Sequence, residues 1–121
     1  MESKKLNQKL IFAIPELKEK YLEEISWQDG ENTGSHVIFC DVFVPFIKEN
    51  VERKNDALIK KCFDFIENLL DLEDKYTDEV ITFSVIETLL FDEDVENKSF
   101  LKFCGTKTLT VVEEIVKYIA E

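Results

Sequence analysis

Apolar residues recur at intervals of three and four along most of the chain, and this spacing predicts a protein made of helices. The first example is Leu6, Leu10 and Ile14, in a lysine-rich opening segment. A second helix follows, and its apolar stripe comprises Leu17, Tyr21, Leu22 and Ile25. We expect Trp27 to close this second helix against the core. The segment Asp29–Gly34 then has the glycines and polar residues of a loop.

The segment Ser35–Glu52 fits two different structures. Its aliphatic and aromatic residues favour a β-strand by composition. Their spacing favours a helix, because polar and apolar residues separate onto two faces of a helical wheel. The polar face comprises Asp41, Pro45, Lys48 and Glu52, and the inward face comprises Phe39, Phe43, Phe46 and Ile47. We favour a helix with Ser35 as its N-cap and a bend at Pro45, and a strand over Ser35–Val44 stays the alternative.

The next helix is the most clearly amphipathic part of the chain, and it covers Asn55–Leu72. Charged residues share one side of it, and the other half comprises Leu58, Ile59, Cys62, Phe65, Ile66, Leu69 and Leu72. Thr77 has the character of an N-cap for the following helix. Over Val80–Phe91 only Glu87 is charged, so we expect this helix to lie largely buried at the centre of the fold.

The C-terminal part adds two further helices. Asn97–Cys104 has the pattern of a short helix that Gly105 ends. The last helix is expected to begin at Thr108 or Thr110. Its inner stripe comprises Leu109, Val112, Val116 and Ile119. The pattern therefore predicts an all-α fold of about six helices packed as antiparallel pairs in a single domain over residues 1–121, with HEAT-like stacking as one arrangement of the pairs.

Charge adds information about partners. The chain has 26 acidic against 15 basic residues, a formal net charge of −11. The segment Asp64–Glu96 alone holds twelve acidic residues and a single base, Lys75. Such a surface repels the phosphates of nucleic acids and of anionic membranes, whereas it attracts a basic protein. We therefore expect a protein partner, with no nucleic acid and no membrane.

The cysteines and the N-terminal residues favour a cytoplasmic protein. Cys40, Cys62 and Cys104 are an odd number of widely spaced cysteines among apolar neighbours. This pattern is typical of reduced thiols in a core rather than of a disulfide framework. The opening residues lack the apolar stretch of a signal peptide, and no apolar run reaches the roughly 18 residues of a membrane span.

Residues with catalytic or metal-binding chemistry are few. His36 is the only histidine, so any Ser–His–Asp or Cys–His site would depend on it, and zinc would lack ligands at a suitable spacing. The acidic run over residues 92–96 lacks the pattern of an EF-hand, and no phosphate-binding glycine loop occurs. We expect no catalytic residue, no metal and no cofactor. Glu87 is interpreted as a charge on a narrow exposed strip of its helix, with a buried ion pair as the alternative.

Four stretches carry a family resemblance, namely Asp41–Ile47, Cys62–Leu70, Ser84–Leu90 and Phe103–Thr108. Through them the chain resembles, over Ser35–Ile119, a family of small, acidic, helical bacterial proteins of uncharacterised function. The resemblance implies a role like that of immunity proteins, which are produced beside secreted polymorphic toxins of the contact-dependent inhibition type and protect the producing cell. It implies no catalytic residue.

We therefore expect an immunity protein that binds and neutralises the C-terminal toxin domain of a large secreted protein. A toxin that cuts nucleic acid presents a basic groove, and an acidic surface associates with such a groove rapidly. The residues expected to form this surface lie at two helix junctions and are Asp71, Glu73, Asp74 and Asp78, and Asp92, Glu93, Asp94 and Glu96. The alternatives are a helical adaptor that binds an unrelated cellular protein and an enzyme that uses Glu87 or another carboxylate.

Overall fold

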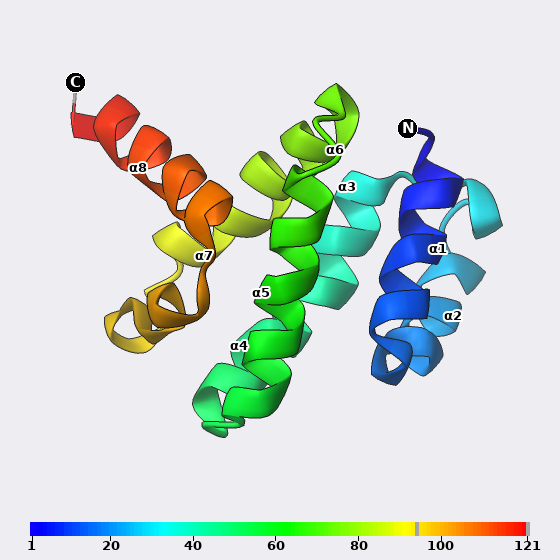
Figure 1. Ribbon diagram of the computed structural model, residues 1–121. Coiled ribbons are helices and arrows are strands. Elements are labelled where there is room, and N and C mark those ends of the chain that lie inside the picture. Colours follow the sequence, from blue (N-terminus) through cyan, green and yellow to red (C-terminus); the bar gives the residue numbers. More distant parts are fainter. Residues whose placement is uncertain (94, 121) are drawn as a thin grey trace.

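The computed structural model describes residues 1–93 and 95–120, except for the side chains of residues 96, 97 and 120. All of the regular secondary structure in these residues is helical. The prediction of an all-α fold is therefore confirmed. The elements in order are α1 (Ser3–Ala13), η1 (Pro15–Leu17), α2 (Lys18–Ser26), η2 (Gly30–Asn32), α3 (Ser35–Ile38), η3 (Phe39–Phe43), α4 (Val44–Glu52), α5 (Asp56–Leu70), α6 (Lys75–Glu79), η4 (Val80–Ile86), α7 (Glu87–Phe91), η5 (Glu96–Phe103) and α8 (Thr106–Ala120). The N-terminal helices α1 and α2 lie at one end of the molecule and α8 at the other (Figure 1).

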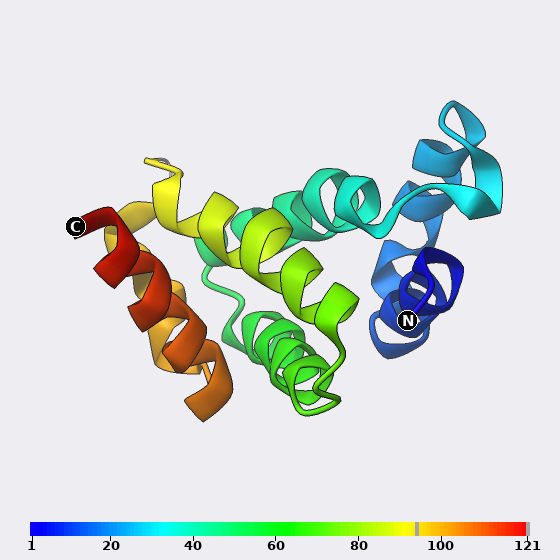
Figure 2. The same cartoon turned by 90° about the horizontal axis from the view of Figure 1, so that it is seen from above.

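Three long helical rods form the centre of the molecule. The elements α3, η3 and α4 follow one another without interruption, as do α6, η4 and α7. These two rods lie side by side, and α5 packs against them (Figure 2). Phe39 and Phe43 of η3 meet edge-on with ring centroids 5.7 Å apart and are fully buried, as predicted. Phe63 of α5 stacks on Phe100 of η5 with ring centroids 5.5 Å apart, which joins the C-terminal part to this centre.

The segment that fitted either a helix or a strand is helical throughout. Gly34, not Ser35, is its N-cap residue, so the prediction for Ser35 is wrong. The Ser35 side chain turns inward and donates to Asn7 Oδ1 at 2.8 Å, which fixes α3 against α1. The turn η3, just before Pro45, is π-helical. Because a proline offers no backbone N–H, the regular α-helical ladder is interrupted at Pro45.

Two predicted helix starts are also wrong, each because another residue caps the helix. Asp74 is the N-cap of α6, where its Oδ2 accepts from Thr77 N at 3.0 Å and from Thr77 Oγ1 at 2.7 Å. Thr77 is consequently a buried residue inside the helix. The last helix begins at Thr106, before both predicted positions, because its first turn is capped by Glu67 of α5.

Several residues expected in the core are exposed at the two ends of the molecule. Trp27 at the end of α2 is 69% exposed, so it does not close that helix against the core. In the predicted inner stripe of the last helix only Val112 is buried, while Val116 and Ile119 are more than half exposed. Ile115 takes their place in the core. In the described residues no further helix packs over these outer faces, and a helical spacing alone does not reveal which side lacks a neighbour.

Candidate protein-binding groove

An apolar groove runs along the surface between η4–α7 and α8, and we call it the C-terminal groove. It has a volume of about 450 Å³. One wall is formed by Thr82, Phe83, Glu87 and Phe91, and the other by Val111, Glu114, Ile115, Tyr118 and Ile119. Each set follows helical spacing, so the groove is lined by the facing sides of two helices.

Large apolar side chains in this groove contact solvent. Phe83 is 57% exposed, Phe91 53%, Tyr118 81% and Ile119 54%. The neighbouring residues of the same rod, such as Val85 and Leu89, are fully buried, so only part of the predicted central helix is buried as expected. Single exposed apolar side chains are ordinary, but several that share one groove form the kind of surface found at binding sites.

Carboxylates border the apolar surface. Glu87 lies in one wall of the C-terminal groove and Glu114 in the other. A second depression of about 330 Å³ shares Thr82 and Phe83 with it and adds further acidic residues and one base: Glu73, Lys75, Asp78 and Glu79. Glu87 is thus half-buried at a groove edge, in agreement with its interpretation as a charge on a narrow exposed strip.

Helix α8 is held in place by a carboxylate from α5. Glu67 Oε2 accepts from Lys107 N at 2.9 Å, and Oε1 accepts from Thr108 N at 2.9 Å and from Thr108 Oγ1 at 2.8 Å. Burial acts to raise the pKa of Glu67, but these hydrogen bonds outweigh it and lower the pKa. Glu67 therefore satisfies backbone N–H groups of the first turn of α8, the helix that forms one wall of the groove.

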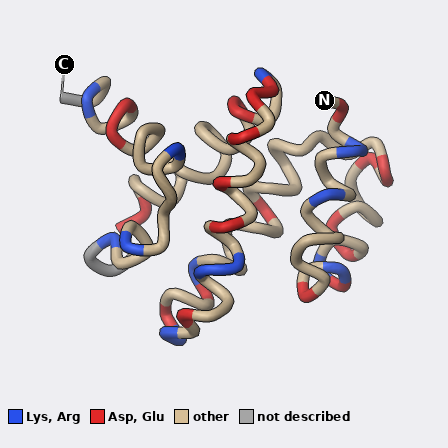
Figure 3. The backbone as a smooth tube through the Cα atoms, viewed as in Figure 1, with Lys and Arg blue, Asp and Glu red and all other residues tan. Residues whose placement is uncertain are grey.

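The first predicted acidic junction is the turn between α5 and α6, where Figure 3 shows acidic residues gathered. Asp71 and Glu73 are exposed, and both approach Lys107 Nζ, at 3.2 Å and 3.9 Å. Asp74 Oδ1 accepts from the N-terminal ammonium at 2.8 Å, and this bond together with those from Thr77 lowers the pKa of Asp74 to about 2. Burial raises the pKa of Asp78. The structure thus brings these four residues together, but Asp74 already acts within the fold.

The second predicted junction follows α7 and lies at the other end of the same rod. Asp92 forms an ion pair with Lys48 of α4, and its backbone oxygen accepts from Lys98 Nζ at 2.6 Å. Glu93 is exposed. Asp94 and the side chain of Glu96 lie outside the described residues. The rod from α6 to α7 has 17 residues and separates the two junctions by about 25 Å. The acidic segment therefore forms separate groups rather than one continuous patch.

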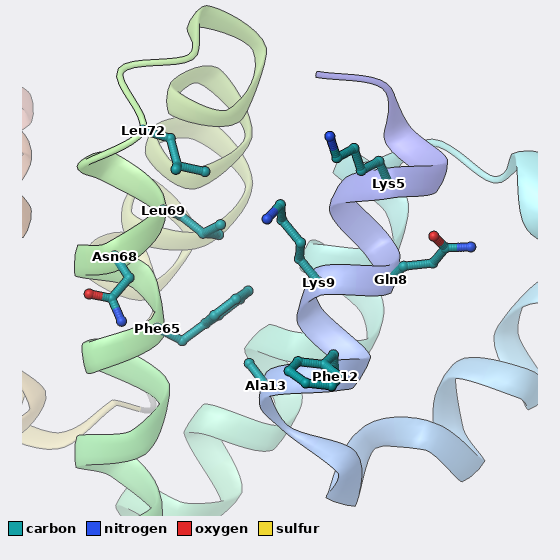
Figure 4. A pocket seen from close by; sticks show the side chains of 9 residues that line it. All are labelled: Lys5, Gln8, Lys9, Phe12, Ala13, Phe65, Asn68, Leu69 and Leu72. Carbon is teal, nitrogen blue, oxygen red and sulfur yellow. The ribbon is translucent and has the colours of Figure 1, made fainter.

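A groove of the opposite charge lies between α1 and α5, and we call it the N-terminal groove (Figure 4). It has a volume of about 430 Å³. Phe12, which is 90% exposed, and Leu72 are its exposed apolar residues. Lys9 reaches from α1 into the gap, with Lys5 one turn away, and the described residues form no ion pair with either lysine (Figure 4). Neither groove was predicted from the sequence. The sequence feature that indicates them is the width of the apolar faces on these helices.

The only histidine contacts a serine in an arrangement that differs from a catalytic triad. His36 Nδ1 lies 2.6 Å from Ser84 Oγ, and the imidazole ring meets the Tyr76 ring edge-on at 5.8 Å. In a Ser–His–Asp triad the serine is bound to Nε2, whereas Nδ1 faces the acid. Ser84 is also 93% covered within a helix, so the pair joins α3 to η4.

The cysteines are free thiols, and burial raises the pKa of Cys62 and of Cys104 to about 12 and also raises that of Cys40. Thiols with a raised pKa are poor nucleophiles. Among the described residues, no group of three or more His, Cys, Asp or Glu side chains is placed to hold a metal ion. In the same part of the chain, no helix has the length and apolar character needed to cross a membrane.

The fold and its surface define a small all-α protein with an apolar groove at its C-terminal end and a basic one near its N-terminus. The chain belongs to a family described as a domain of unknown function, DUF7674, whose model matches residues 7–119. No curated protein and no solved structure matches the chain. The expected membership of an uncharacterised helical family is confirmed, whereas the link to toxin immunity stays a prediction.

Proposed function

We propose that this protein acts by binding another protein through the C-terminal groove and the acidic residues beside it. The observation that carries the proposal is the exposure of Phe83, Phe91 and Tyr118 in one groove bordered by carboxylates. Removing such side chains from water is the main favourable contribution at protein interfaces, and aromatic residues are frequent among the strongest contributors. The proposal requires no catalytic residue.

The partner in this proposal is the C-terminal toxin domain of a large secreted protein, which the chain binds and neutralises in the cytoplasm. The family resemblance and the net charge of −11 support this choice, because a toxin acting on nucleic acid needs a basic surface. An acidic partner approaches that surface quickly and blocks it. The alternative is a helical adaptor for an unrelated cellular protein, which has the same structural support.

Co-expression with a toxin tests this function. The gene beside that of the chain is examined for a large secreted protein, and its C-terminal domain is expressed in a bacterial host with and without the chain. We expect growth arrest by the domain alone, normal growth with both, and a stable complex of the purified proteins. If the two proteins neither bind nor restore growth, the immunity function is wrong. Specific binding to a cellular regulator instead would support the adaptor.

A further inference from the structure

The shape of the C-terminal groove limits what can fill it. In the η4–α7 wall, Phe83, Glu87 and Phe91 succeed one another at intervals of four residues. The two phenylalanines lie about 12 Å apart along this rod, because a helix rises 1.5 Å per residue. A second helix, α8, forms the facing wall. A groove between two helices that is long enough for about two helical turns fits the apolar face of a third helix.

The charges beside the groove determine the character of that helix. Glu87 borders the groove from one wall and Glu114 from the other. Asp78 and Glu79 extend this acidic border in the neighbouring depression, which Phe83 also lines. Lys75 is the single base among the residues lining either depression. A helix with acidic flanks would place like charges together here, whereas lysine or arginine at the flanking positions would meet carboxylates on both sides.

We propose that the occupant of the C-terminal groove is a basic amphipathic helix of the partner protein. Its apolar residues pack between Phe83, Phe91 and Tyr118, and its lysine or arginine side chains face Glu87 and Glu114. This inference rests on the proposed protein-binding function and specifies the part of the partner that is bound. It also predicts that this helix does not bind in the N-terminal groove, because the lysines there repel its basic side chains.

Two synthetic peptides test the proposal directly on the full-length protein. Both have leucines at the same helical spacing, and they differ only in carrying lysine or glutamate at the flanking positions. Binding is measured by calorimetry, and the contacted residues are mapped by amide chemical shifts. We expect the lysine peptide to bind with a dissociation constant in the micromolar range, with shifts at η4, α7 and α8, and to bind at least about tenfold more tightly than the glutamate peptide.

Matched variants assign the contribution of each part. Phe83→Ala and Tyr118→Ala should each weaken binding of the lysine peptide about tenfold, whereas Phe12→Ala, in the N-terminal groove, should leave it unchanged. All three side chains are more than half exposed, so the variants are expected to fold, which circular dichroism checks. The double variant Glu87→Gln and Glu114→Gln should weaken binding about fivefold and reduce its salt dependence.

Several results would overturn the inference. These are absence of binding by the lysine peptide, equal affinity for both peptides, or binding that Phe12→Ala weakens while Phe83→Ala and Tyr118→Ala do not. A toxin complex that forms with full affinity when Phe83 and Tyr118 are replaced would also refute it, together with binding through the C-terminal groove, while leaving the immunity role itself intact. Conversely, groove binding of the lysine peptide without any toxin neutralisation would refute only the immunity function.

Discussion

The contact between Gly105 and Glu67 leads to a quantitative prediction about how α8 is attached. Gly105 directly precedes α8 and has no side chain to cap it, and Glu67 supplies the cap from α5. A Cβ atom added to Gly105 would lie 2.5 Å from Glu67 Cδ and Oε1 and 2.8 Å from Cγ. The Gly105→Ala variant must therefore displace the carboxylate that caps the helix.

The size of the effect follows from the lost cap. Loss of a helix N-cap costs about 0.5–2 kcal/mol, typically about 1 kcal/mol, and we expect this loss from Glu67→Ala and also from Gly105→Ala. In the double variant, all three atoms that the new Cβ would approach are absent. Gly105 does not lie in the left-handed region, so alanine then fits and stabilises by about 0.4–1 kcal/mol through a less flexible unfolded chain. The coupling between the two substitutions should thus be on the order of 2 kcal/mol.

Urea unfolding monitored by circular dichroism at pH 7 measures this double-mutant cycle. Each single variant should lower the urea midpoint by roughly 0.5–1 M, and adding Gly105→Ala to Glu67→Ala should lower it no further. Because the folded-state pKa of Glu67 is lowered, its contribution is present above the unfolded pKa of about 4.3 and is lost as the pH falls through the folded pKa. The cost of Gly105→Ala should therefore shrink in acid. Additive effects of the two substitutions would refute the reasoning.

Three further predictions concern other parts of the fold. Asp74→Ala should lower the melting temperature, because α6 loses its cap and Met1 loses its ion pair. With a folded pKa of about 2, the difference from the unsubstituted protein should be fully present above about pH 4 and should shrink as the pH falls from 4 through 2. A difference that stays constant over this range would contradict the prediction. Cys62, which is buried with a pKa of about 12, should react with iodoacetamide far more slowly in the folded protein than in urea, as mass spectrometry of the labelled peptide can show. Trp27→Phe should change the unfolding free energy by less than about 0.5 kcal/mol, and iodide should quench the Trp27 fluorescence readily; a protected fluorophore would place this side chain in the core after all.

The helices could be predicted because their determinants are local. Apolar residues at intervals of three and four place Leu6, Leu10 and Ile66 on buried faces, and each of them is fully buried. The N-cap residues were harder to predict. Several neighbouring residues can serve as the cap, and a residue distant in the sequence can also supply it. Glu67 lies about 40 positions before the helix that it caps, and nothing in the spacing around Thr108 indicates it.

The grooves could not be predicted, because the spacing of apolar residues does not tell which neighbour is missing. The segment Val80–Phe91 is apolar nearly all round, which is typical of a buried helix. In the structure, Val85 and Leu89 are buried as expected, whereas Phe83 and Phe91 are exposed. The difference arises from the position of α8, which covers only part of this rod and leaves the groove open. Ile119 of α8 lines the same groove and is exposed for the same reason.

The net charge of the chain is a poor guide to its binding surface, because many carboxylates already have partners within the fold. Glu67 caps α8, Asp74 caps α6 and holds the N-terminus, and Asp92 pairs with Lys48. Substituting these residues should mainly change the stability of the fold, and any effect on association should be a consequence of that change. Glu87 and Glu114 are different, because they border an apolar groove, where a partner's cation would be partly removed from water. Charge reversal there should therefore slow association more than an equal change at the structural carboxylates, even though the net charge changes by the same amount.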